Sequence, residues 1–172
     1  MISMSVGLPS VVNDFMPIVK ILRARGVLPV FAIGNDGPGM SRTPGNYPNV
    51  LSVGFIDRQG MVDDRSSSQT FPRKEDSIVP DLVAPGVAIV SAKKGTKTYQ
   101  TMDGSSMATP HVAGLAALLV QAFPKATPDQ LEAAIEKSAS RPPQMDAERG
   151  NRGIRDASKA YDLLSEIVGK KK

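Results

Sequence analysis

The stretch GSSMATPHVAGLAALL, at residues 104–119, decides how the rest of the chain is interpreted. A polar turn that contains glycine leads into small and apolar residues, which predicts a helix over residues 106–122 that is buried on nearly every face. We expect Ser106 at the N-cap of this helix, where the first backbone N–H groups have no intrahelical acceptor. A hydroxyl beside such donors suits a nucleophile in acyl transfer, and a serine that only caps the helix is the simpler alternative.

The composition is that of one globular domain with a core of ordinary size. The 172 residues are 41% hydrophobic and 22% charged, and the net charge is +4. Three terminal lysines supply much of that charge, which predicts a domain at residues 1–168 and a basic tail at residues 169–172. The other basic residues are scattered and there is no tryptophan, which argues against a nucleic-acid partner. The sequence has no cysteine for disulfides or thiolate metal sites, and no apolar run long enough to span a membrane.

Three apolar runs predict the parallel strands of an α/β fold. They lie at residues 2–6, 27–33 and 50–56, and the second is nearly continuously apolar, as in a strand covered on both faces. Apolar residues at helical spacing predict a helix over residues 11–25, so the chain begins with a right-handed β-α-β crossover. We expect this helix and the helix at residues 106–122 to pack on opposite faces of the sheet.

The remaining chain predicts one hairpin and two further helices. Strands at residues 89–92 and 98–102 flank a short polar turn, as in a hairpin. Thr127 and Gln130 form a capping box that opens a helix to about residue 139, and a last amphipathic helix includes Ala160 and Ile167.

Three ordered motifs resemble those of the subtilisin-like serine proteases, or subtilases. Residues 104–114, GSSMATPHVAG, match the G-T-S-M-A-x-P-H-V-A-G block of the family, with Ser105 where threonine is usual. Residues 32–37, AIGNDG, match A-x-G-N-[DE]-G, and residues 80–87, PDLVAPGV, match P-D-[LIV]-x-A-P-G-V. The resemblance implies a three-layer α/β fold with a parallel sheet and helices on both faces, present only as the C-terminal half of the catalytic domain.

The resemblance also implies roles for individual residues. Ser106 matches the nucleophile of a serine endopeptidase, and Asn35 matches the residue whose amide stabilises the oxyanion together with the Ser106 N–H. A polypeptide substrate is expected across two segments that border the main specificity pocket, where Ile33 would favour a large apolar or aromatic residue before the scissile bond. The implied substrate-binding residues are Ser5, Val6, Gly7, Ala32, Ile33 and Gly34.

The general base of a serine protease is not evident in the sequence. The family carries Asp and then His upstream of Ser, so these residues are expected in an N-terminal half that this chain lacks and that would be its partner. The sole histidine, His111, follows Ser106 by five residues, about 140° around the helix axis and roughly 7.5 Å along it. We therefore expect His111 to be a buried structural residue, the chain alone to be inactive, and the strand at residues 2–6 to present a bare apolar edge.

Other interpretations remain open at this stage. The chain is alternatively a non-catalytic subtilase remnant that binds peptides or proteins, or a flavodoxin-like ligand-binding domain that imitates the motifs by chance. The chemistry of the family requires no cofactor. A structural calcium ion is conceivable at Asp57, Asp63 and Asp64, but their spacing is not that of a calcium loop, so we expect solvated loop carboxylates.

Overall fold

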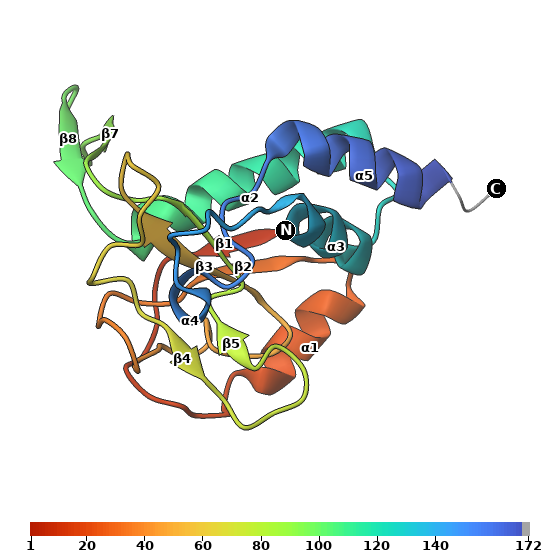
Figure 1. Ribbon diagram of the computed structural model, residues 1–172. Coiled ribbons are helices and arrows are strands. Elements are labelled where there is room, and N and C mark those ends of the chain that lie inside the picture. The colour runs from red at the N-terminus through yellow and green to blue at the C-terminus, as the bar shows by residue number, and fades with distance from the viewer. Residues whose placement is uncertain (170–172) are drawn as a thin grey trace.

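A parallel four-stranded sheet in the order β1-β2-β3-β6 forms the centre of the computed structural model, which describes residues 1–169 (Figure 1). Its strands are β1 (Ile2–Met4), β2 (Pro29–Ala32), β3 (Leu51–Ile56) and β6 (Leu82–Pro85). The three predicted strands are confirmed and pair in parallel. The fourth strand, β6, escapes prediction because it is short and ends in a proline, although it lies inside the motif at residues 80–87.

Helices cover both faces of the sheet, as predicted. Helix α1 (Met16–Ala24) buries Val19 against Phe31, whereas α2 (Ser105–Ala122) joins the large core cluster that contains Val30. Val30 and Phe31 are consecutive residues of β2, and consecutive side chains of a strand point to opposite faces. Figure 1 shows α1 on one side of the sheet and α2 with α5 (Ala157–Gly169) on the other.

The two long helices differ from prediction in their details. Helix α1 starts at Met16, not at residue 11, with Pro17 in its first turn. Helix α2 starts at Ser105 after Gly104 as N-cap, so Ser106 is the second helical residue and the N-cap prediction is wrong. The prediction that α2 is buried on nearly every face is also wrong, because one strip of it is exposed and Leu118 there is 64% accessible.

The other elements are short and surround this framework. Strands β4 (Gln69–Thr70) and β5 (Ile78–Val79) form an antiparallel pair, and β7 (Ile89–Ala92) and β8 (Tyr99–Met102) form the predicted hairpin. The capping box of Thr127 and Gln130 is present at the start of α3 (Pro128–Ser138), and α4 (Ala147–Gly150) follows. No described helix is long and apolar enough to cross a membrane. Gly169, the first residue of the predicted tail, ends α5, and residues 170–172 lie outside the described residues.

Arg152 joins three acidic side chains on separate elements. It lies 3.3 Å from the carboxylate of buried Asp81, 3.3 Å from Glu136 and 3.5 Å from Asp76. The Asp81 carboxylate also accepts a 2.6 Å hydrogen bond from the Ser52 N–H. Burial raises the pKa of Asp81 well above its ordinary value and that of Glu136 to about 7, so these two carboxyl groups hold their protons more tightly than free carboxylates do.

The Glu136→Gln variant tests this protonation. Because the folded chain binds the Glu136 proton more tightly than the unfolded chain does, the contribution of Glu136 to wild-type stability falls as the pH rises from its ordinary pKa of 4.5 to about 7. Glutamine lacks this titration, so we expect the free energy of unfolding of the variant, relative to wild type, to increase by roughly 1–3 kcal/mol between about pH 5 and pH 8.

Urea unfolding at a series of pH values measures this difference. Glu75→Gln, which removes an exposed carboxylate outside the cluster, is the control for the loss of one negative charge. Parallel stability profiles for Glu136→Gln and wild type would contradict the raised pKa.

Candidate active site

A cavity of about 200 Å³ lies at the carboxyl ends of β1 and β2, beside the first turn of α2. Ligands of open α/β sheets bind at this edge. The cavity, called the Ser106 cavity below, brings together both predicted catalytic residues and five of the six predicted substrate-binding residues. It is lined by Ser5, Val6, Gly7, Ala32, Gly34, Asn35, Arg42, Ser105 and Ser106.

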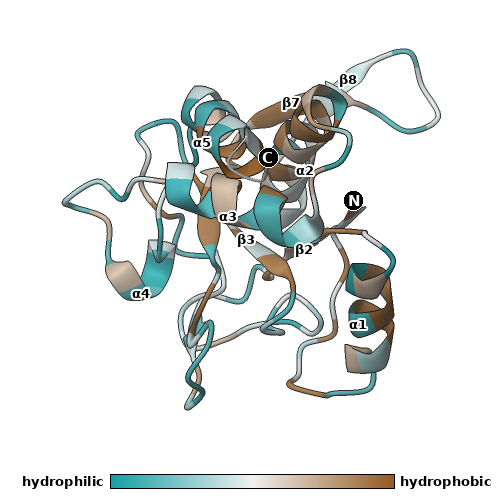
Figure 2. Cartoon of the chain, turned by 90° about the vertical axis from the view of Figure 1, so that its right-hand side faces the viewer, coloured by the Kyte–Doolittle hydropathy of each residue, from teal (hydrophilic) through white to brown (hydrophobic). Residues whose placement is uncertain are grey.

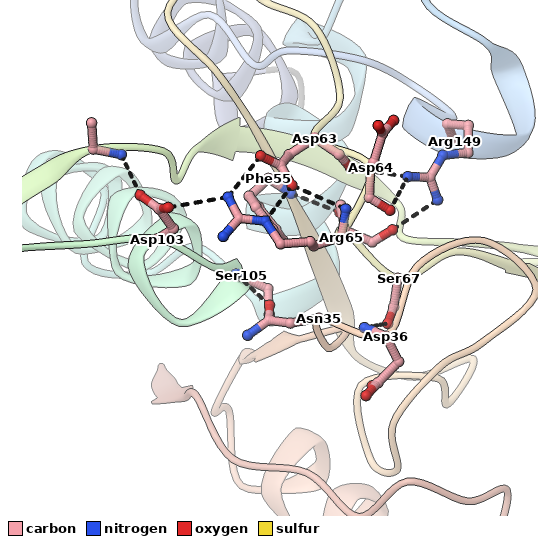
Figure 3. A network of polar contacts seen from close by, with 12 residues as sticks. Asn35, Asp36, Phe55, Asp63, Asp64, Arg65, Ser67, Asp103, Ser105 and Arg149 are labelled. Carbon is pink, nitrogen blue, oxygen red and sulfur yellow. Dashed lines mark hydrogen bonds and ion pairs between the residues drawn. The ribbon is translucent and has the colours of Figure 1, made fainter.

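The Asn35 amide is held in one orientation by Ser105. Its Oδ1 accepts hydrogen bonds from both the N–H and the Oγ of Ser105, each at 2.9 Å. The Nδ2 group therefore points away from Ser105 (Figure 3) and has no hydrogen-bond acceptor among the described residues. Gly104 makes room for it, because a Cβ there would lie 2.9 Å from Asn35 Nδ2, and its φ of 135° favours glycine.

The first turn of α2 leaves a second donor free. The Ser105 N–H donates to Asn35, and the N–H groups of Met107 and Ala108 donate to the Gly104 carbonyl at 3.0 and 3.3 Å. In the part of the chain that the structure describes, the Ser106 N–H has no acceptor. The Ser106 N–H and Asn35 Nδ2 are thus two unused donors at the positive end of a helix, where developing negative charge is favoured.

Ser106 is half-buried and its hydroxyl already has a partner. Its Oγ donates to the Ser5 carbonyl at 3.3 Å, and Ser5 Oγ donates in return to the Ser106 carbonyl at 3.1 Å. Among residues 1–169, no imidazole or carboxylate is hydrogen-bonded to Ser106 Oγ. The structure therefore places the candidate nucleophile Ser106 beside the end of β1. Among the described residues, no base contacts its hydroxyl.

His111 differs from its predicted environment. It is exposed on α2, so the prediction of a buried histidine is wrong. Its Nδ1 lies 2.8 Å from the carbonyl oxygen of Met107, one turn earlier on the same helix. This local contact holds the ring against its own helix. Ser106 Oγ donates to the Ser5 carbonyl and not to His111.

Ile33 does not line the Ser106 cavity. It is fully buried, its N–H donates to the Val53 carbonyl at 3.1 Å, and its carbonyl accepts from the Arg42 N–H at 2.9 Å. The Gly34 N–H likewise donates to Ser105 Oγ at 3.3 Å. These N–H groups are therefore not free to pair with a peptide, and Ile33 does not form the apolar wall that the resemblance implies.

Two residues of the site escape prediction. Arg42 lines the cavity although it belongs to no motif, and only the fold-back of residues 34–48 brings it there. Ser105 is part of a motif, where it is visible only as a replacement for threonine. Its buried hydroxyl accepts from the Gly34 N–H and donates to Asn35 Oδ1. Both partners lie some 70 positions earlier in the chain, so the sequence does not reveal this role.

The loop at residues 57–68, whose carboxylates were predicted to be solvated, packs against the site and supports it. Ser67 Oγ accepts from the Asp36 N–H at 2.9 Å, next to Asn35, and Ser67 is buried. Arg65 lies over the Phe55 ring and pairs with Asp63 at 2.8 Å and Asp103 at 3.1 Å (Figure 3). Since Asp103 precedes the N-cap of α2, these contacts connect the loop to the start of that helix.

The carboxylates of Asp57 and Asp63 in this loop have protein partners. Asp57 accepts from the N–H groups of Gln59 and Met61, each at 2.9 Å, and Asp63 pairs with Arg65. Among the described residues, three potential metal-ligand atoms converge only in the cluster that Arg152 joins. Calcium binding stays an untested prediction.

The family model for the Subtilase family matches residues 1–168. The chain belongs to the subtilase family. This subtilase is 36% identical over 138 residues to Subtilisin Savinase of Lederbergia lenta, which covers 80% of the chain and 48% of Savinase. It is 44% identical over 125 residues to an intracellular serine protease of Paenibacillus polymyxa, which covers 70% of the chain and 36% of that protease.

Solved structures confirm the subtilase fold. The prenylagaramide maturation protease PagA matches with a TM-score of 0.82 and 26% identity, over 95% of this chain and 61% of PagA. An S218A mutant of the protease domain of PatA matches with a TM-score of 0.80 and 29% identity, over 96% of this chain and 59% of that solved domain. The chain thus spans about 60% of these structures and 34% to 48% of several curated relatives. A chance flavodoxin-like imitation is excluded.

The Ser105→Ala variant tests how the Asn35 amide is held. Removing the buried hydroxyl leaves the Gly34 N–H without its acceptor and Asn35 Oδ1 with one donor, so we expect a loss of about 1–3 kcal/mol in the free energy of unfolding. Ser105→Thr keeps the hydroxyl and should lose less.

Urea unfolding measures the loss, and the side-chain amide resonances of Asn35 report its mobility by NMR. Unchanged stability and unchanged Asn35 resonances in Ser105→Ala would show that this hydroxyl does not hold the amide.

Proposed function

We propose that this chain supplies the nucleophile and the oxyanion hole of a serine endopeptidase, and that the base and its orienting carboxylate come from a segment outside this chain. The main support is that two unused donors, the Ser106 N–H and Asn35 Nδ2, adjoin Ser106 Oγ in a single cavity. Membership of the subtilase family, with proteases among its relatives, supports the same reaction class.

In the proposed reaction, Ser106 Oγ attacks the carbonyl carbon of a peptide bond while the external base accepts the hydroxyl proton. The former carbonyl oxygen becomes an oxyanion that accepts hydrogen bonds from the Ser106 N–H and Asn35 Nδ2. The base then donates its proton to the leaving amine, and water hydrolyses the acyl-enzyme. For subtilisin, loss of the corresponding asparagine costs about 2.7–4 kcal/mol of transition-state stabilisation.

The surface beside β1 supports docking of the segment that brings the base. β1 is an edge strand, so one side of its backbone is unpaired in the sheet. An apolar cavity of about 390 Å³ lies between β1 and α1, and two residues that line it, Ile2 and Ile18, are 39% and 56% exposed. Figure 2 shows hydrophobic residues of α1 on the same side of the molecule as the N-terminus. An exposed apolar surface of this kind is typical of a protein interaction site.

The second candidate function is that of a non-catalytic remnant that binds peptides. The observation that favours it is the Ser106–Ser5 hydrogen bond, which leaves the hydroxyl with an acceptor that is not a base. The two functions differ in whether Ser106 reacts once a base is supplied.

Labelling with a phosphonate probe for active serines tests the proposed chemistry. We expect no labelling of the chain alone, and labelling at Ser106 once an N-terminal subtilase fragment with the Asp and His is added. Ser106→Ala should abolish labelling and hydrolysis, and Asn35→Ala should lower kcat by roughly 10²–10³.

His111→Ala is the control, because the exposed His111 does not line the Ser106 cavity and its ring is hydrogen-bonded to the Met107 carbonyl of its own helix, so it should leave labelling intact. Labelling of the unaided chain at Ser106 would place the base within this chain. A complemented chain that still fails to label would favour the non-catalytic remnant.

Analytical ultracentrifugation tests the docking surface. We expect the chain alone to form dimers or larger species, and a double variant of Ile2→Glu with Ile18→Glu to shift it toward the monomer, because two charges would then face the apolar cavity. Val90→Glu, at an exposed position of the β7–β8 hairpin, is the control. A wild-type chain that stays monomeric and binds no N-terminal fragment would contradict the proposed surface.

A further inference from the structure

Arg42 fills the space that two glycines leave open in the Ser106 cavity. A Cβ on Gly7 would lie 2.8 Å from Arg42 Cβ, and a Cβ on Gly34 would lie 2.8 Å from Arg42 Cγ. Gly7 and Gly34 belong to the two segments that border the expected specificity pocket. The aliphatic part of an arginine therefore occupies room that a large substrate side chain would need.

The guanidinium of Arg42 is fixed by Asp36. Its Nε donates to Asp36 Oδ2 at 2.6 Å and its Nη2 donates to Oδ1 at 2.8 Å, which is a bidentate pair. Nη1 lies 3.5 Å from the Gly7 carbonyl, at the limit of a hydrogen bond. Asp36 is anchored in turn through its N–H to Ser67, so the charged pair is part of the supporting loop.

The pair leaves hydrogen-bond donors for a ligand. A guanidinium has five N–H groups, and Asp36 and Gly7 use three of those on Arg42. The Arg42 side chain is 36% exposed, so the remaining N–H groups can be reached. The hydrogen bond from Arg42 holds the pKa of Asp36 below its ordinary value, so the pair stays ionised at neutral pH.

We propose that Arg42 determines the substrate specificity of this site, which accepts a carboxylate or carboxamide side chain before the scissile bond and disfavours large apolar or aromatic ones. A glutamate, glutamine, aspartate or asparagine side chain accepts from the free N–H groups. A phenylalanine side chain would clash with the arginine stem and remove those N–H groups from water without an acceptor. This inference rests on the proposed function of the Ser106 cavity, and it replaces the apolar preference that the sequence predicted through Ile33.

Asp36 moderates the preference for acids. Because its carboxylate faces the same guanidinium, the pair has no net charge, and a substrate carboxylate gains less than it would from an isolated arginine. Glutamate and glutamine should therefore be accepted to similar degrees by the wild-type chain. Removal of the Asp36 charge should separate them in favour of glutamate.

The test measures binding of product-like peptides, acetyl-Ala-Ala-X with a free carboxyl end, to the chain as it exists. X is Glu, Gln, Leu or Phe, and NMR shifts of the Ser106 N–H and the Asn35 amide report occupancy of the site. We expect Glu and Gln peptides to bind about tenfold more tightly than the Phe peptide. Asp36→Asn should raise the ratio of Glu to Gln affinity.

Two replacements of Arg42 separate its volume from its charge. Arg42→Met keeps an aliphatic stem without donors, so it should lose the preference for Glu and Gln without gaining affinity for Phe. Arg42→Gly opens the space and should reverse the preference in favour of Phe. Arg58→Gly, which removes an exposed arginine that does not line the Ser106 cavity, should leave the order unchanged.

The outcomes separate this inference from the proposed function. Peptides that bind the wild-type chain with Leu or Phe preferred would overturn the role of Arg42 and leave the proposed function in place. Failure of every peptide to shift Ser106 and Asn35, together with no labelling of the complemented chain, would overturn the proposed function itself.

Discussion

The buried hydroxyl of Ser105 is the contact on which the rest of the site depends. It accepts from the N–H at the end of β2 and donates to the Asn35 side chain, while its own N–H donates to the same oxygen. These three hydrogen bonds fix where α2 begins relative to the sheet. They orient Asn35 Nδ2 away from Ser105. They also determine that the Ser106 N–H is the group of the first turn without an acceptor among the described residues.

The layer between this contact and the loop at residues 57–68 is polar. Ser66 and Ser67 are buried, and their hydroxyls accept from backbone N–H groups of Phe55 and Asp36. Arg149 reaches from α4 to the carbonyl of Ser66 at 2.7 Å. Because the hydroxyls of Ser66 and Ser67 both have partners, the layer keeps its geometry without a large apolar core of its own.

Much of the α/β framework was predictable because local sequence patterns determine its strands and helices. Continuous apolar runs identify β2 and β3, and the capping box with its proline identifies the start of α3. Ser106 and Asn35 were predicted from the two family motifs that contain them, and the structure places both in the Ser106 cavity. Exposure and contact depend instead on segments distant in sequence, which explains why exposed His111, buried Ile33 and the position of Arg42 required the structure.

The hydrogen bond between Ser106 and Ser5 has a consequence for the order of events at the site. The Ser5 carbonyl, which accepts the Ser106 hydroxyl, belongs to one of the two segments predicted to bind an extended peptide by strand addition. A peptide N–H that takes this carbonyl competes with the hydroxyl for the same oxygen. Peptide binding would therefore break the hydrogen bond between Ser106 Oγ and the Ser5 carbonyl. Occupation of the site by peptide and release of the Ser106 hydroxyl for reaction would then be coupled through one backbone oxygen.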